Sequence, residues 1–423
     1  MPSSLSTLIT QPTARVFRRL YMKRRILSTG LFEPAWQEMT GFVKRWGTTE
    51  STIDDVNLNR FTQSGIVLVM RNDTGAFNPE SNTQSFWYGY LTRYRTLVKI
   101  EAGYFDEADS ELPADPTQGI FLLDGEIEIG SSNNEAVLNC RALSSVFSEV
   151  RAVDVAGLGI TLTSTQILQR IRDHTDGASA SVFGQFIPAV DWTIPSLTTA
   201  YLLNSTGSLA SMSCWDLITK LAESETRIPT ITRTGGLEFR GRSEERGSFV
   251  LYGQGFPRQN VIRLDNYKEA LDKYYTFFRF KFRPEDTSTS FVTAGTQTTV
   301  TPGNLSWKYG ARVYEFEHDF FQTTTAAQAV VDGMLAEFST LKAELRVVAK
   351  FIPDIDIGDR VDLYYRSYDL AGATIWDGFA WDAADWDGDK GENFDWFGVQ
   401  FLVLSRQTNL GDFTTTLQLR SVI

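Results

Sequence analysis

The sequence contains few of the residues on which most catalytic and metal sites depend. Its 423 residues include two histidines, His174 and His318, and two cysteines, Cys140 and Cys214, which are far apart and form no CxxC pair. This cysteine content indicates neither a disulfide framework nor a zinc site, and it favours folding in a reducing compartment. His174 lies near the end of a predicted helix, where a solvated imidazolium is an ordinary feature.

Enzyme motifs are missing as well. The chain has no GxSxG elbow, no HExxH helix, no Walker loop and no GxGxxG after a predicted strand. The carboxylate pairs Asp54-Asp55 and Glu126/Glu128 could serve acid–base chemistry, but any exposed strand face offers such a pair. We therefore predict that the chain is not an enzyme and needs no cofactor. A cell-wall hydrolase is the alternative that the sequence favours least.

Long hydrophobic runs and net positive charge are also absent. No window approaches the roughly 18 apolar residues of a transmembrane helix, and the N-terminal sequence lacks a signal-peptide pattern. We predict synthesis in the cytoplasm and no stable membrane insertion. The formal net charge of −12 disfavours a protein that coats nucleic acid, although it suits a channel through which a polyanion slides without adhering.

What the chain does contain indicates packed, mainly β domains. Hydrophobic residues make up 42% and aromatic residues 13% of the sequence, which is ample for globular cores. We expect a flexible arm at 1–14, β regions at 15–150 and 261–423, and an α+β unit at 151–260. The predicted fold class is α+β, mainly β.

Turn and capping signals predict individual elements. Helices are expected at 165–174 after a cap at Thr163 or Ser164, from Ser213 with Asp216 in a capping-box position, and at 323–341. Glycine turns predict hairpins around Asp124-Gly125 and Gly235-Gly236. Strands are expected at 66–70, 97–100, 345–351, 361–365, 400–404 and 414–419.

The most unusual segment is the Trp/Asp-rich stretch IWDGFAWDAADWDGDKGENFDWFG, predicted as a loop over 374–397. Its Trp-Asp pairs recur every five residues, a step that fits neither a helix nor a strand. Aromatic side chains are typical of interface centres. The residues expected to form contacts are Trp376, Trp381, Trp386, Phe394 and Trp396. A sugar-stacking platform is the alternative.

Within this stretch, Asp385, Asp387 and Asp389 match the first ligand positions of a calcium loop. The match then fails, because Lys390 stands where glycine is needed and Trp396 where a bidentate Glu belongs. We favour a solvated acidic turn over a metal site.

A basic cluster near the N-terminus is the other outlier. It consists of Arg15, Arg18, Arg19, Lys23, Arg24 and Arg25. A nucleic-acid site would be isolated on so acidic a chain. Pairing with a neighbour's carboxylates, or a solvated strand face, is the favoured interpretation.

Three groups of segments together resemble a known family. RLYMKRR at 19–25, GLFE at 30–33, Trp36, VKRWG at 43–47, LVMRNDTGAF at 68–77 and SFWYGY at 85–90 are similar to siphophage tail-tip proteins. SCWDLITKLAE at 213–223 with GLEFR at 236–240 resembles baseplate hub proteins of tailed phages. PDIDIGDRVDLY at 353–364 is similar to a late barrel strand of those hubs. The resemblance covers most of 15–423 in order.

This resemblance implies two barrels of tail-tube type joined by an α+β insertion. Three copies would form a ring of pseudo-sixfold symmetry that continues the tube at the distal end of a virion tail. The implied partners are the tail tube or a distal tail protein, the tape-measure protein terminus and the tail fibre or tip proteins. Phage DNA would pass through the channel without specific binding. No catalytic residue is implied, and a receptor- or glycan-binding tail protein is the alternative.

Overall fold

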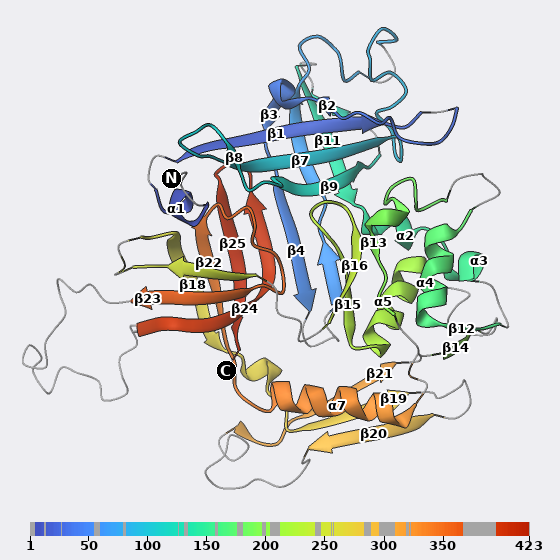
Figure 1. The fold of residues 1–423 in the computed structure, drawn as a ribbon, viewed down its shortest axis with the longest axis vertical. Helices are drawn as coiled ribbons and strands as arrows, with labels where there is room; N and C mark the ends of the chain where they lie inside the picture. Colours follow the sequence, from blue (N-terminus) through green and yellow to red (C-terminus); the bar gives the residue numbers. More distant parts are fainter. Residues whose placement is uncertain are drawn as a thin grey trace, which may run out of the picture.

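The computed structural model shows a curled, mainly β chain of the α+β class, as predicted (Figure 1). The described residues are 5–11, 14–26, 28–54, 60–78, 82–125, 127–130, 134–156, 160–175, 181–196, 200–203, 212–241, 247–254, 256, 258–282, 289–295, 309–318, 321, 323–366 and 395–422. Among these residues, no helix combines the length and the apolar character that crossing a bilayer requires.

The first large sheet follows the order β2-β1-β7-β9-β11-β6-β3, with β8 beside β7 and β10 beside β11. Its strands are β1 (Arg15–Arg24), β2 (Gln37–Glu38), β3 (Val43–Arg45), β6 (Ile66–Arg71), β7 (Thr96–Phe105), β8 (Glu111–Leu112), β9 (Thr117–Leu123), β10 (Glu128–Ile129) and β11 (Glu135–Ala142). Every second residue of β11 is buried, which is the pattern of a strand with one face in the core.

The two ends of this strand order are joined by a short stretch of chain. β2 is followed by the 3-10 helix η1 (Thr40–Phe42) and then by β3. Leu20 of β1 anchors this link, since its carbonyl accepts from Met39 N at 2.7 Å and its own N–H donates to Thr40 Oγ1 at 3.0 Å. The sheet therefore curls back on itself.

A smaller α+β unit follows. It contains α2 (Ser144–Ser148), α3 (Ala152–Ala156), α4 (Ser164–Asp173), η2 (Ala189–Asp191) and α5 (Cys214–Ser224). Its strands are β12 (Ile160–Thr163), which pairs with β14 (Ala200–Leu203), and β13 (Trp192–Thr193), β16 (Leu237–Gly241) and β15 (Arg227–Ile231), which form a sheet in that order.

Local sequence signals determine where the two longer helices of this unit begin. Thr163 Oγ1 accepts from Gln166 N at 3.3 Å, and the Gln166 side chain accepts from Thr163 N at 2.9 Å. Ser213 and Asp216 form the same reciprocal pair before α5, at 3.1 and 3.3 Å. Each capping box satisfies N–H groups that a helix start leaves open. Both predicted caps are confirmed, as is the hairpin that turns at Gly235 (φ +86°).

The second large sheet follows the order β17-β23-β24-β25-β22-β18, with β4 beside β24 and β5 beside β4. Its strands are β4 (Thr48–Asp54), β5 (Arg60–Gln63), β17 (Ser248–Tyr252), β18 (Val261–Glu269), β22 (Ala343–Lys350), β23 (Arg360–Arg366), β24 (Asp395–Asn409) and β25 (Thr414–Ser421). Two of these strands come from the predicted first β region and one from the predicted α+β unit. The limits 15–150, 151–260 and 261–423 stay predictions, and these pairings cross them.

Asn260, directly before β18, connects the two ends of this second strand order. Its side chain donates from Nδ2 to Val250 O at 3.0 Å and accepts at Oδ1 from Tyr252 N at 2.7 Å, both in β17. Its carbonyl accepts from Lys350 N at the end of β22, at 2.7 Å. The second sheet is thus also curled until its edges meet.

A third, small sheet lies next to the helix α7 (Thr324–Phe338), as Figure 1 shows. Its order is β20-β19-β21, with β19 (Phe277–Phe282), β20 (Ser290–Gly295) and β21 (Val313–His318) preceded by η4 (Leu271–Lys273) and followed by α7. Phe278, Phe280 and Phe282 pack with Met334 and Phe338 of the helix. The helix predicted at 323–341 is therefore confirmed, and the spacing of its buried residues explains its position.

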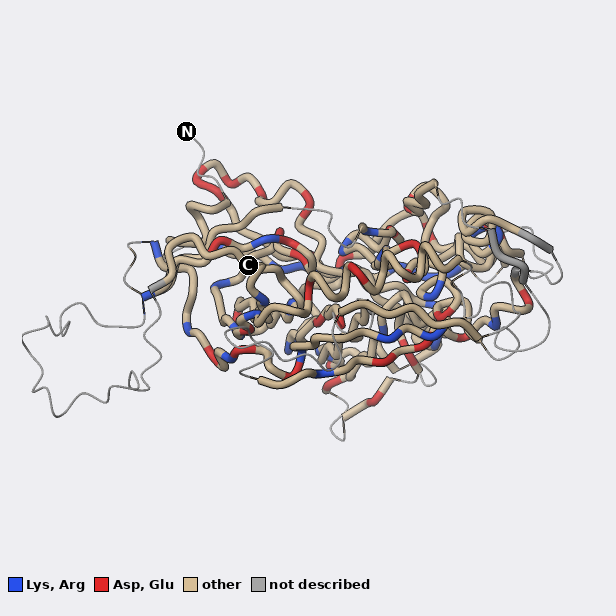
Figure 2. The backbone as a smooth tube through the Cα atoms, turned by 90° about the horizontal axis from the view of Figure 1, so that it is seen from below, with Lys and Arg blue, Asp and Glu red and all other residues tan. Residues whose placement is uncertain are grey.

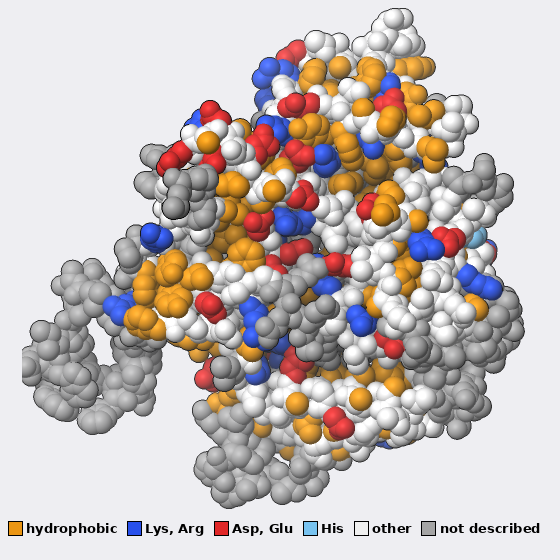
Figure 3. Space-filling model, viewed as in Figure 1, with side chains coloured by type: hydrophobic (Ala, Val, Ile, Leu, Met, Phe, Trp, Pro, Cys, Tyr) orange, Lys and Arg blue, Asp and Glu red, His pale blue; other side chains and the backbone are white. Residues whose placement is uncertain are grey.

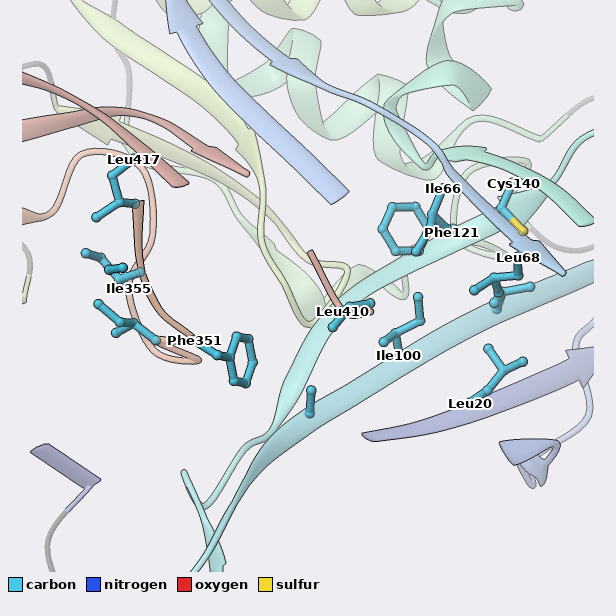
Figure 4. Packing of buried hydrophobic residues seen from close by; sticks show 14 of the residues in the cluster. Leu20, Ile66, Leu68, Ile100, Phe121, Cys140, Phe351, Ile355, Leu410 and Leu417 are labelled. Carbon is cyan, nitrogen blue, oxygen red and sulfur yellow. The ribbon is translucent and has the colours of Figure 1, made fainter. Parts of the chain in front are cut away.

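One continuous core joins the two large sheets (Figure 4). Leu20, Ile66, Leu68, Ile100, Phe121 and Cys140 come from the first sheet, and Phe351, Ile355, Leu410 and Leu417 come from the second sheet and its turns. Because they share this core, the two sheets form one packed body. Charged residues of both signs are interspersed along its backbone (Figure 2).

Part of the predicted flexible arm at 1–14 is helical. The short helix α1 (Leu5–Thr10) buries Leu8 and Ile9, with 2% and 6% exposed, in the core between the large sheets. Lys350 Nζ donates to Thr10 O at 3.3 Å. The polar composition of this segment predicts a flexible arm, but three of its apolar residues lie on one side of a helix and pack against the core.

The strands on either side of Gly125 do not form a hairpin with each other. β9 and β10 both pair with β11, with Leu123 opposite Cys140 and Glu128 opposite Val137. Gly125 has φ +74°, so the signal for a left-handed residue is correct. The hairpin prediction is wrong, because the chain continues along β11 after the interruption.

Candidate functional site on the outer face of the second sheet

Of the predicted site residues, Trp396 lies within the described part of the chain. Trp376, Trp381, Trp386, Phe394, Asp385, Asp387 and Asp389 lie outside it, so the contact and calcium-loop predictions for them stay predictions. The Trp396 ring is partly buried, 5.7 Å from the Tyr267 ring and 5.6 Å from the Phe401 ring. Among the described residues, no group of three or more His, Cys, Asp or Glu side chains could hold a metal ion.

Three residues of the N-terminal basic cluster pair with carboxylates of the same chain. Arg19 donates to Glu111 from both terminal guanidinium nitrogens, from Nη2 at 2.5 Å and from Nη1 at 3.0 Å. Arg24 Nε donates to Glu33 Oε1 at 3.0 Å, and Arg15 pairs with Asp109. These three arginines therefore pair with carboxylates of their own chain.

Arg18 of the same cluster links the two large sheets. Its guanidinium lies 5.3 Å from the ring centroids of both Trp46 and Phe413, and Nη1 donates to Leu410 O at 2.5 Å. Burial lowers the pKa of Arg18. The side chain therefore has a structural role between the sheets.

Alternate residues of the second sheet form a polar face on the side away from the core. Arg346 of β22 lies opposite Gln418 of β25, and Gln418 lies opposite Ser405 of β24. Val347 and Leu417, which alternate with these residues, are fully buried. Strand alternation thus separates a dry face from a hydrated one.

A groove of about 540 Å³ hollows this polar face. Its lining residues are Glu50, Asn266, Lys268, Glu344, Leu345, Arg346, Ser405, Gln407, Thr416 and Gln418. Small-molecule pockets of similar size are mostly apolar and aromatic. This lining contains no aromatic residue and one apolar residue, Leu345. The groove is therefore better suited to hydration by water than to binding an aromatic or apolar ligand.

Glu344 is the most buried charged residue of the groove, with 2% of its side chain exposed. Lys273 Nζ of η4 lies 2.5 Å from its Oε1, and Lys268 Nζ of β18 lies 3.3 Å from its Oε2. Lys268 also lies 3.3 Å from Asp272. Burial acts to lower the pKa of Lys268, but the two carboxylates outweigh it and the pKa is raised. One buried carboxylate is therefore shared by two ammonium groups.

A second surface feature is an aromatic platform at the end of the same sheet, defined as Tyr252, Phe256, Tyr364 and Phe397. The rings of Phe256 and Phe397 are 5.5 Å apart, and those of Tyr252 and Tyr364 are 5.2 Å apart. Phe397 is 54% exposed, and the Arg366 guanidinium lies 4.6 Å from its centroid. Figure 3 shows a hydrophobic surface over the ends of β23 and β24, at the left.

A buried charge network joins three parts of the fold at the turn before β23. Arg240 of β16 donates from Nη1 to Ile357 O at 2.7 Å, and its Nη2 lies 3.5 Å from Asp356 Oδ2. Arg406 of β24 donates to Gln118 of β9. Burial lowers the pKa of Arg406 to about 10. The first sheet, the α+β unit and the second sheet therefore meet at one polar cluster.

Two carboxylates of this network have opposite pKa shifts. Burial raises the pKa of Asp354, and nearby Arg233 and Arg406 do not overcome it. Burial also acts to raise the pKa of Asp356, but Arg240, Arg406 and Arg233 together lower it. The arginines of this network were not predicted from the sequence, although Arg406 can be recognised as a charged residue soon after the apolar run 401–404 of the same strand.

No protein-family model matches the chain, and no curated protein sequence matches it. By structure, the chain is similar to the tail protein from Neisseria meningitidis MC58, with a TM-score of 0.52, 13% identity, and coverage of 96% of this chain and 97% of that chain. It is also similar to the 43 kDa tail protein of prophage MuSo2 from Shewanella oneidensis, with a TM-score of 0.50, 10% identity, and coverage of 95% and 98%. At such low identity, the likeness concerns the fold. The chain therefore has the fold of these tail proteins, as its resemblance to phage tail-tip and hub proteins predicts.

Proposed function

We propose that the chain is the structural hub of a phage tail tip, in which three copies form a ring that continues the tail tube. The observation that carries this proposal is the likeness in fold to two tail proteins over at least 95% of this chain. A likeness of that extent includes both large sheets and the α+β unit. It favours a common architecture over a single shared motif.

The surface of the second sheet supports the channel part of the proposal. A tube for DNA needs a hydrated wall without a net basic charge, because basic footprints bind phosphates. The groove has two acidic and two basic side chains in its lining: Glu50, Glu344, Lys268 and Arg346. The chain as a whole carries a formal charge of −12, which repels a polyanion.

In this role, the ring contacts the tail tube or a distal tail protein above and fibre or tip proteins below, at the distal end of the tail. The tape-measure protein terminus reaches the ring from inside the tube. Phage DNA crosses the channel without specific binding. The ring holds the end of the tube closed until receptor engagement changes its contacts, so the role is structural and not enzymatic.

The test is the mass of the purified chain in solution, measured by light scattering coupled to size exclusion, with electron micrographs of the same sample. We expect a trimer and ring-shaped particles. A chain that stays monomeric at high concentration contradicts the hub proposal.

A receptor- or glycan-binding role is the second candidate, and the aromatic platform favours it. Aromatic rings with an exposed face are suited to partners that present both apolar and polar groups. Phe397→Ala is expected to weaken binding to purified bacterial surface polysaccharide, as is replacement of Trp376, Trp381 and Trp386 by Ala. Phe291→Ala serves as the control, since Phe291 is 48% exposed on the small sheet. Absence of binding by the unaltered chain rejects this candidate.

A further inference from the structure

We propose that Glu344 prevents the basic side chains around the groove from binding DNA phosphates. The inference rests on the proposed channel role of this face. It gives a specific task to a side chain that also forms a structural ion pair.

The cations in question lie close together on one part of the outer face. Lys268 is 50% exposed, and Arg346, two residues from Glu344 on β22, is also exposed. Lys273 approaches the same carboxylate from η4. A cluster of lysine and arginine on one surface is what non-specific phosphate binding requires.

Glu344 is placed to counter this cluster because it is buried beneath the lysines. It lies directly opposite Lys268 in the β18–β22 register, and it is 2% exposed. Charges that are removed from solvent are screened much less by salt than surface charges are. Glu344 therefore holds both ammonium groups at ionic strengths that weaken an exposed pair.

The second carboxylate near the lysines is less well placed. Asp272 is 63% exposed and lies 3.3 Å from Lys268. Exposed ion pairs contribute little and weaken with salt. Loss of the Asp272 charge is therefore expected to release Lys268 in part, while loss of the Glu344 charge removes the carboxylate that two lysines share.

A matched control exists on the small sheet. Glu315 is 62% exposed and lies 3.3 Å from Arg279, whose guanidinium also lies 4.4 Å from the Phe291 ring. The next pair on the same strands is Lys281 and Glu317, at 2.6 Å. Glu315→Gln makes the same change in net charge as Glu344→Gln, away from the groove.

The experiment measures binding of a short, fluorescently labelled, random-sequence duplex DNA to the full chain by anisotropy over a series of salt concentrations. Glu344→Gln is expected to bind more tightly than the unaltered chain. The salt dependence, plotted as log K against log salt, should steepen by about one to two units, one for each added phosphate contact. Asp272→Asn is expected to show a smaller change in the same direction, and Glu315→Gln no change.

Equal effects of Glu344→Gln and Glu315→Gln overturn the proposal, as does the absence of any gain with Glu344→Gln. If Glu344→Gln does not fold, Asp272→Asn decides the question, and no gain relative to Glu315→Gln then counts against it. Mass in solution is measured for every variant. A ring without a DNA effect contradicts this inference alone, whereas a monomer contradicts the hub proposal.

Discussion

Asn260 binds Tyr252 as a neighbouring strand would. Asn260 N donates to Tyr252 O at 2.9 Å, and Asn260 Oδ1 accepts from Tyr252 N at 2.7 Å. The same side chain also donates to Val250 O at 3.0 Å. The outer side of β17, which otherwise presents open backbone groups to other chains, is covered here by one residue that is 6% exposed.

Asn260→Leu is therefore expected to destabilise the chain by about 1–3 kcal/mol, because Tyr252 N and Val250 O lose their partners in a partly buried place. Urea unfolding followed by circular dichroism measures the change. Gln418→Ala, on the exposed polar face, is the control and should alter stability little. A change no larger than that of the control contradicts the role given to Asn260.

Asp354 and Asp356 should respond oppositely to amidation at neutral pH. The pKa of Asp354 is raised by burial, so its contribution to stability is present at low pH and is lost as pH rises through the folded pKa. Asp354→Asn should therefore stabilise the chain at neutral pH, with an effect that vanishes below the unfolded pKa of about 3.9. Thermal unfolding over a pH series tests this expectation.

Asp356 has the reverse sign, because the arginines around it lower its pKa in spite of burial. Its contribution is present above the unfolded pKa and is lost as pH falls through the lowered folded pKa. Asp356→Asn should therefore destabilise the chain at neutral pH. The two variants serve as controls for each other, and shifts of the same sign at neutral pH contradict the account.

The pair of His318 and Glu223 fastens the small sheet to the α+β unit. His318 Nε2 lies 2.9 Å from Glu223 Oε2, and the two side chains are 3% and 1% exposed. Glu223→Ala should cost about 1–3 kcal/mol, since it removes a buried hydrogen-bond partner. A double-mutant cycle with His318→Ala should give a coupling energy of about 0.5–3 kcal/mol. A cycle that combines Glu223 with exposed Glu315 is the control and should give a coupling energy near zero. A coupling energy near zero for Glu223 and His318 contradicts the link.

Leu8→Ala tests whether the N-terminal helix is docked in solution. Leu8 is 2% exposed in the core between the two large sheets, and truncation of such a leucine typically costs about 2–5 kcal/mol. Ser6→Ala, at an exposed position of the same helix, is the control. Equal and small effects of the two substitutions would support a free arm, as the sequence predicts.

Structure that is determined by neighbours along the chain was predicted correctly from the sequence. The caps at Thr163 and Ser213 and the turn at Gly235 depend on side chains within a few residues, so their signals are readable in a single sequence. The pairing of strands that are distant in the sequence was not predicted. The residue types of Thr48–Asp54 do not indicate that β4 pairs with β24, more than 350 residues later in the sequence.

The candidate site has the same limitation. The polar alternation at Ser405, Gln407, Thr416 and Gln418 can be read in the sequence, and it predicts that each strand has one hydrated face. Which strands bring these faces together depends on the register between β4, β18, β22, β24 and β25. Glu344, within a largely apolar strand, was the local sign of an unusual position.

The crossing of β4 and β5 into the second sheet has a consequence for how this protein can be divided. The chain leaves the first sheet after β3, adds two strands to the second sheet, and returns at β6. A fragment that ends near residue 150 thus keeps β4, whose pairing partner β24 is in the other fragment, together with β5, which pairs with β4. Neither half is a self-sufficient unit for recombination, and any exchange of the second large sheet between related chains must carry residues 48–63 with it.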